Sequence, residues 1–357
     1  MSSEPEPPRG EHEPKGEEEE ALQQRPWALL STVAVVVHGG DPRIPKGADI
    51  ALDLHVPPRC SRIVLSRRIA PAADRNGASD LPQVVAADPS GRLLLRATQR
   101  DGVGAYFLSD EQTRRATRLP PVPASLDLGA GPRRSSGFGL IVVPARGGGG
   151  EDCFVAKLLR PKSSPTGEAT LLYYSAATAE WNVKRLAASA PENLQAWRNN
   201  GGVIAHAGKV WWVDLTLGML VWDPCIPESD FHFVALPEDR EVLGGSKGDG
   251  DIDGPAKHRH VGVSEGMVRY LEISGLEDKV AVRMSTLMSD AKVTAEWTLY
   301  YQLPLVDIWE GKLRARILRK TKRLQLALVH PYIPSNIFFI HGTKMFSVDT
   351  MEKNSFF

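Results

Sequence analysis

The chain is poor in cysteine and has no long apolar segment. Its three cysteines, Cys60, Cys153 and Cys225, are widely spaced, odd in number and without a Cys-x-x-Cys pair, which argues against a disulfide framework or a zinc site. The longest largely apolar run, residues 27–37, is too short to span a bilayer. The four glutamates at 17–20 have the wrong charge for a signal peptide. We therefore expect a cytoplasmic or nuclear protein, with no membrane contact and no disulfide-linked partner.

Long helical patterns are also scarce, whereas turn-forming residues are abundant. The 357 residues include 32 glycines and 27 prolines, a composition that favours many short strands joined by turns. The 43 basic residues balance the 43 acidic ones. This neutral net charge gives no indication of a nucleic-acid partner, and we do not expect one. Residues 1–25 hold eight glutamates and one large apolar residue, Leu22. We predict that this acidic tail is disordered, because it has little to bury.

Residues 209–237 carry the clearest structural pattern in the chain. They predict three consecutive antiparallel strands, with a tight turn at Thr216-Leu217-Gly218 and with Asp214 and Asp223 where strands end. Apolar and aromatic residues occupy both faces of these strands. This is typical of a sheet that is packed between neighbouring sheets.

A loose unit recurs along the chain, in which an aromatic strand ends in Asp or Ser and a following strand closes with Leu-Pro or Leu-Ala. A spacing of roughly 40–55 residues is typical of propeller blades. We predict an all-β fold, a propeller-like arrangement of small antiparallel sheets; the alternative is two packed β-domains. After the tail at 1–25, we expect an N-terminal β region at 26–130 and a C-terminal β region at 131–357.

A family resemblance is carried mainly by residues 209–350. The matching pieces are Trp211-Trp212-Val213-Asp214-Leu215, Gly218-Met219-Leu220, Asp223-Pro224, residues 233–237, residues 261–264 with Gly266, residues 328–331 and Val348-Asp349. This pattern resembles the plant family, expanded in grasses, of uncharacterised proteins known as domain of unknown function 1618. The resemblance implies a propeller-like all-β fold and no assigned activity. The F-box helices that precede some relatives have no counterpart here.

The Gly-x-Ser-x-Gly pattern at 262–266 invites a hydrolase interpretation, in which Ser264 would be a nucleophile. That role needs a strand before the serine and a helix after it. The residues that follow, Met267 onward, have the composition of a return strand. We therefore predict a hairpin turn at Ser264-Glu265-Gly266, with glycine supplying a positive φ.

Two further patterns resemble metal sites but lack essential ligands. Asp249, Asp251 and Asp253 open like a calcium loop, yet His260 stands where the bidentate acid is required. His258 and His260 could bind zinc, but no third or fourth ligand lies near them in sequence. We interpret them as loop histidines and assign no catalytic, cofactor-binding or metal residues.

Residues 312–323 contain seven basic residues in twelve. This run predicts possible partner contacts at Arg316, Arg319 and Arg323. The most favoured function is a non-enzymatic protein-interaction module whose partner, a protein with an acidic contact face, is gripped by the loops 127–137, 145–152 and 244–260. One alternative is a hydrolase or sugar-active enzyme with a site in a propeller channel. Another is a nucleic-acid-linked regulator that uses the basic run.

Overall fold

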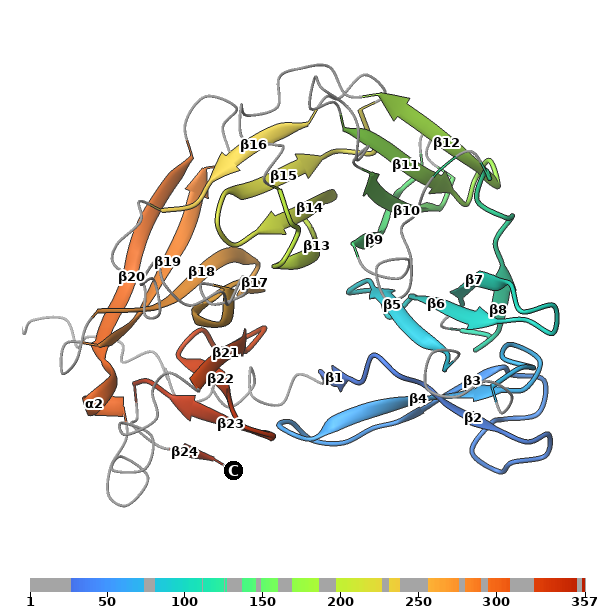
Figure 1. Cartoon of the computed structure of the whole chain (residues 1–357), viewed down its shortest axis with the longest axis horizontal. Helices are drawn as coiled ribbons and strands as arrows, with labels where there is room; N and C mark the ends of the chain where they lie inside the picture. The colour runs from blue at the N-terminus through green and yellow to red at the C-terminus, as the bar shows by residue number, and fades with distance from the viewer. Residues whose placement is uncertain are drawn as a thin grey trace, which may run out of the picture.

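The protein is a ring of small sheets. The computed structural model describes residues 27–73, 81–110, 112–124, 126, 137–145, 149–159, 169–185, 197–226, 231–237, 256–275, 280–289, 295–308, 324–351 and 355–356. Within these residues, six four-stranded sheets follow one another around the ring in chain order (Figure 1). The predicted all-β, propeller-like fold is thereby confirmed.

Five of the sheets are antiparallel meanders, in which each strand pairs with the next one along the chain, and these form the blades. The first two blades are β5 (Gln83–Ala87), β6 (Leu93–Thr98), β7 (Gly104–Ser109) and β8 (Ala116–Arg118), then β9 (Phe138–Pro144), β10 (Glu151–Leu159), β11 (Thr170–Ser175) and β12 (Glu180–Arg185). The third is β13 (Gly202–His206), β14 (Lys209–Asp214), β15 (Gly218–Trp222) and β16 (His232–Ala235). The last two are β17 (Arg259–Ser264), β18 (Met267–Ser274), β19 (Ala281–Ser289) and β20 (Glu296–Pro304), then β21 (Leu324–Val329), β22 (Asn336–His341), β23 (Lys344–Asp349) and β24 (Ser355–Phe356). The described residues also include two short helices, η4 (Ala256–His258) and α2 (Leu305–Ile308).

The blades are held together by apolar clusters that lie between neighbouring sheets. The β13–β16 blade shows this most clearly, because successive side chains of a strand point to opposite faces. Trp212 packs into the cluster shared with the β9–β12 blade, and Trp211 into the cluster shared with the β17–β20 blade. Both tryptophans are buried. The predicted three-strand meander, with apolar residues on both faces, is therefore confirmed. Its first turn occupies residues 215–217, one residue earlier than predicted, and Gly218 begins β15.

The sixth sheet is mixed and joins the first blade to the last. Its strands are β1 (Leu29–Leu30), β2 (Val35–Val37), β3 (Ile50–Asp53) and β4 (Cys60–Ser66), and β1 and β2 run parallel to β4. Between β1 and β2, Val33 forms a bridge with Gln83 of the neighbouring blade. On the other side, the Trp27 ring contacts His330 and Phe338 of the β21–β24 blade, with centroids 4.7 and 5.5 Å apart. The N-terminal sheet thus contacts both of its neighbours in the ring.

The recurring unit of the sequence corresponds to the outer strands of the blades. Its copies fall on β7 and β8, on β11 and β12, and on β14 to β16. The third strands of successive blades begin 48 to 66 residues apart, so most intervals exceed the predicted 40–55. The division into 26–130 and 131–357 stays a prediction. The tail at 1–25 lies outside the described residues. In the part of the chain that is described, no helix is long and apolar enough to cross a membrane.

Candidate functional site

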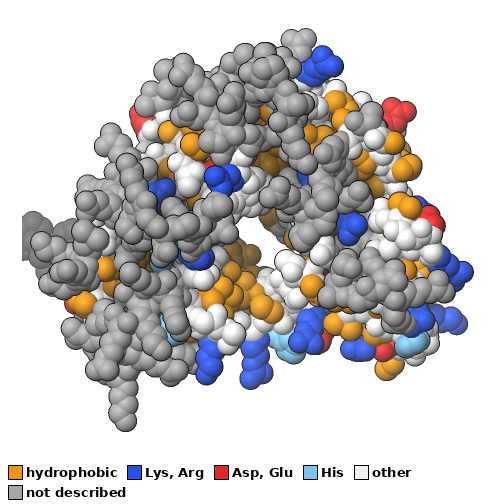
Figure 2. All heavy atoms as spheres, in the orientation of Figure 1, with side chains coloured by type: hydrophobic (Ala, Val, Ile, Leu, Met, Phe, Trp, Pro, Cys, Tyr) orange, Lys and Arg blue, Asp and Glu red, His pale blue; other side chains and the backbone are white. Residues whose placement is uncertain are grey.

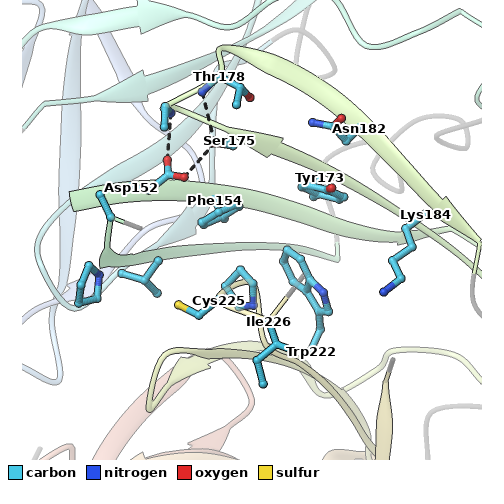
Figure 3. Close-up of a pocket in the computed structure, with 15 residues that line it drawn as sticks. Asp152, Phe154, Tyr173, Ser175, Thr178, Asn182, Lys184, Trp222, Cys225 and Ile226 are labelled. Atoms are coloured by element: carbon cyan, nitrogen blue, oxygen red, sulfur yellow. Dashed lines mark hydrogen bonds between the residues drawn. The ribbon is translucent and has the colours of Figure 1, made fainter. Parts of the chain in front are cut away.

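A groove of about 430 Å³ opens between the β9–β12 and β13–β16 blades (Figure 3). Strands of the β9–β12 blade supply one wall, and the end of β15 with the turn after it supplies the other. The side chains that line it are mostly apolar or aromatic, with a few polar groups at the rim. Its lining residues include Phe154, Tyr173, Asn182, Lys184, Trp222, Pro224, Cys225 and Ile226.

Three aromatic rings form the floor of this groove. The Trp222 ring lies edge-on to Phe154, with centroids 6.1 Å apart, and is tilted against Tyr173 at 5.3 Å. Trp222 is buried, whereas Phe154 and Tyr173 are half-buried and leave apolar surface open to the groove. The floor is therefore a recessed apolar surface rather than a single aromatic side chain exposed on the outside of the protein.

Strand alternation decides which residues of the outer strand β12 face this floor. Tyr173 pairs with Asn182 across the β11–β12 ladder, so the two side chains share a face of the sheet. Lys184, two residues further on, lies on that same face. The intervening Val183 and the following Arg185 lie on the opposite face and are exposed. The rim therefore adds an amide and an ammonium group to the aromatic floor.

The opposite wall is shaped by the turn that follows β15. The Asp223 carboxylate accepts a hydrogen bond from the Cys225 amide at 2.8 Å, which fixes the turn. This places Ile226 at the edge of the groove, where 53% of its surface remains exposed. An exposed branched apolar side chain beside an apolar floor is suited to contact with another apolar group.

Asp152 is the one carboxylate among the described residues that line the groove, and the fold uses it fully. It is buried and accepts hydrogen bonds from the Cys153 and Ala177 amides at 2.8 and 3.0 Å, and from the Ser175 hydroxyl at 2.9 Å. These bonds tie the β10 end to the turn after β11. A carboxylate held in this way stabilises the blade and is not positioned to exchange protons with a ligand.

The predicted partner-contact residues Arg316, Arg319 and Arg323 lie outside the described residues, as do Asp249, Asp251 and Asp253. Of the predicted binding loops, 127–136 and 244–255 also lie outside them. Two predicted loop boundaries are wrong. Strand β10 already begins at Glu151, which pairs with Pro144 of β9, and residues 256–260 are occupied by η4 and by the start of β17, which pairs with β18.

Ser264 is the last residue of β17, and the predicted hairpin turn to β18 follows it at Glu265 and Gly266. Glu265 and Gly266 both have positive φ, 51° and 68°, as a tight two-residue hairpin requires. The Ser264 hydroxyl is buried and donates to the His330 carbonyl at 2.7 Å. The hairpin interpretation is confirmed, and the helix that a nucleophile elbow needs is replaced by β18.

The prediction that His258 and His260 are loop residues is wrong. His258 belongs to the short helix η4, and His260 lies within β17. Burial lowers the pKa of His260 to about 4. Among the residues that the structure describes, no group of three or more His, Cys, Asp or Glu side chains could hold a metal ion. All three cysteines are free, and burial raises the pKa of the Cys153 thiol to about 12.

Sequence reasoning did not find the groove. The sequence pattern places Trp222 in a strand with apolar residues on both faces, and Trp222 does pack against Phe154. The sequence does contain one indication of the groove: Tyr173 and Trp222 are aromatic residues that each lie near the end of a strand, close to a turn. The chain does not reveal by spacing that the two turns face one groove.

Comparisons with known proteins bear on the β13–β16 blade and the blades after it. Residues 212–340 match the family model "Protein of unknown function (DUF1618)". The resemblance noted from the sequence is thereby confirmed for this segment, which is a little over a third of the chain. No curated protein matches the chain.

Two solved structures illustrate how distant the structural likenesses are. A candidate 6-phosphogluconolactonase from Bacteroides uniformis has a TM-score of 0.34 and 13% identity, covering 76% of this chain and 70% of that one. The α-L-arabinanase of Penicillium chrysogenum, complexed with arabinobiose, has a TM-score of 0.31 and 12% identity, covering 75% of this chain and 77% of that one. Likenesses at this level carry no argument about function.

Proposed function

We propose that this protein is a non-enzymatic interaction module, and that the groove between the β9–β12 and β13–β16 blades holds an apolar side chain of a protein partner. The observation that carries the proposal is the recessed aromatic floor of Phe154, Tyr173 and Trp222 beside the exposed Ile226. An apolar side chain entering this groove would leave water at little cost, because few polar groups are covered.

The rim favours a peptide over a bare hydrocarbon. Asn182 offers an amide that can donate to and accept from a peptide backbone, and Lys184 adds a positive charge. A partner segment that carries an apolar residue next to an acidic one would use both parts of the groove. This agrees with the expectation of an acidic contact face, for which Arg316, Arg319 and Arg323 remain the predicted basic contacts.

The hydrogen bonds that the Asp152 carboxylate already accepts from the fold favour binding over catalysis in this groove. Glycoside hydrolysis uses a pair of carboxyl groups that flank the scissile bond. The groove provides one described carboxylate, and three donors already hold it. The enzyme alternative therefore gains no support from this site.

The test is a selection of peptides from a displayed random library on the purified protein. We expect enriched peptides to share an aromatic or branched apolar residue beside Asp or Glu. Their affinity, measured by fluorescence anisotropy, should fall about tenfold or more in Ile226→Asp, which places a charge in the groove. Val183→Asp is the matched control, because it puts the same charge on the opposite face of β12.

A second pair of variants tests the charged rim. Lys184→Glu should weaken binding of the acidic peptides several-fold and reduce its dependence on salt, whereas the neighbouring Arg185→Glu should change little. Equal losses in each pair would mean that the peptides bind elsewhere. A library that yields no enriched sequence would contradict the proposal.

A further inference from the structure

A second hollow, of about 820 Å³, lies where the N-terminal mixed sheet meets the β5–β8 blade. Four arginines line it: Arg67 and Arg68 from the turn after β4, and Arg115 and Arg118 beside and within β8. They are far apart in sequence and come together because the two sheets are neighbours in the ring. Basic side chains also gather over this part of the molecule in Figure 2.

The surrounding elements carry a local excess of positive charge. Residues 27–124 contain thirteen Lys or Arg against eight Asp and one Glu. The chain as a whole is neutral. Charge in this part of the ring is therefore concentrated, and it attracts anions over distances of about a Debye length, roughly 8–10 Å.

Asp49, the one acidic side chain among the described residues that line the hollow, is neutralised by the fold. Asp49 is buried and accepts hydrogen bonds from the Arg68 guanidinium, from the Ala116 amide at 3.1 Å and from the Ser66 hydroxyl at 3.4 Å. Burial opposes its ionisation, but these donors, Arg68 above all, hold the pKa of Asp49 below its usual range. Arg68 also donates to the Ala116 carbonyl, so this pair joins the two sheets.

Arg115 and Arg118 keep donors for a ligand. Arg115 is anchored through Nε to the Gly47 carbonyl at 3.0 Å. Its two terminal nitrogens, and the whole guanidinium of Arg118, have no partner within the described part of the chain. Thr117, which lies between them and is exposed, adds a hydroxyl to the lining. An anchored guanidinium loses less entropy when it binds an anion.

We propose that this hollow binds the phosphate group of a phosphorylated ligand. Several guanidiniums and a hydroxyl around one space offer more donors than the two oxygens of a carboxylate can use. A phosphomonoester presents three acceptor oxygens and close to two negative charges, and arginine matches it with paired hydrogen bonds. The site is separate from the groove of the proposed function and does not depend on it.

The experiment is a calorimetric titration of the full chain with pyrophosphate at constant ionic strength. We expect saturable binding that weakens about tenfold or more in the double variant Arg115→Gln/Arg118→Gln, because each lost charge-assisted hydrogen bond is worth about that factor. The matched control is Arg59→Gln/Arg100→Gln, which removes two exposed arginines that do not line the hollow. Arg68 is left intact because of its structural pair with Asp49.

Three results would overturn the proposal. Binding in Arg115→Gln/Arg118→Gln equal to that of the unchanged chain would exclude the site. An equal loss in the control variant would mean that general surface charge attracts the anion. A peptide with the sequence of residues 1–25 that binds as tightly as pyrophosphate would show a carboxylate site rather than a phosphate site. Thermal melts of both double variants exclude unfolding as the cause of lost binding.

Discussion

Ser264 owes its position to the hydrogen bond that its hydroxyl makes across two blades. The donor is the last residue of β17, and the acceptor, the His330 carbonyl, follows β21. We expect a fluorophosphonate probe to leave Ser264 unlabelled, because no helix dipole or positioned base activates it. Ser264→Ala should cost about 1 kcal/mol of unfolding free energy, since the buried carbonyl loses its donor. Stoichiometric labelling that Ser264→Ala abolishes would contradict this.

His330 gives the fold a residue-scale dependence on pH. Its Nδ1 accepts hydrogen bonds from the Tyr332 and Ile333 amides at 3.1 and 3.0 Å, and burial lowers its pKa to about 4. In the unfolded chain a histidine titrates near about 6.5. The folded protein therefore binds fewer protons than the unfolded chain between these values. The stabilisation is complete above about pH 6.5 and is lost as the pH falls towards 4.

His330→Asn separates this residue from other titrating groups, including His260, whose pKa is lowered in the same direction. An asparagine oxygen can accept from the same two amides but does not titrate. Urea denaturation at about pH 7.5 and about pH 5 should show a smaller loss of stability in the variant than in the unchanged chain. An identical loss in both proteins would assign the pH dependence to other residues.

At the scale of the element, the β14–β15 hairpin depends on one glycine. Gly218 has a φ of 148°, and an added Cβ would lie 2.6 Å from the Val234 carbonyl oxygen and 2.5 Å from the Phe233 ring. Gly218→Ala should therefore destabilise the fold by about 2 kcal/mol or more. Gly342→Ala is the control, because Gly342 has a φ of 65° but open space around it, so that we expect about 1 kcal/mol. Equal costs in denaturation experiments would mean that β16 moves aside freely.

The elements that the sequence predicts well are those whose signals are local. The β14–β16 meander is predicted by Gly218, by the aspartates at its turns and by apolar residues on both faces of its strands. The mixed N-terminal sheet carries no such signal, because the parallel pairing of β1 with β4 needs no turn between them. For the same reason the bridge from Val33 to Gln83 could not be predicted.

Both sites arise only at the scale of the whole molecule, which is why local patterns did not reveal them. Tyr173 and Trp222 belong to different blades, and Arg68 and Arg118 belong to different sheets. Their proximity depends on the order of sheets around the ring. The recurring unit of the sequence predicts a propeller-like ring. It does not predict which turns of neighbouring sheets lie next to one another.

The acidic tail should contribute little to the stability of the ring. Residues 1–25 carry eight glutamates and little apolar surface. Deleting them should leave the melting temperature and the circular dichroism spectrum nearly unchanged. A large loss of stability would mean that the tail packs against the folded part of the chain.

Trp27, immediately beyond the tail, should behave in the opposite way. It is half-buried, and its edge-on contacts with His330 and Phe338 connect the N-terminal sheet to the last blade. Trp27→Ala should lower the unfolding free energy by about 1–2 kcal/mol, because both ring contacts and part of the buried apolar area are lost. Trp27→Phe, which keeps an aromatic ring, should recover most of that loss in urea denaturation. If Trp27→Ala unfolds at the same urea concentration as the unchanged chain, the contact of Trp27 with the last blade contributes nothing measurable to the stability of the ring.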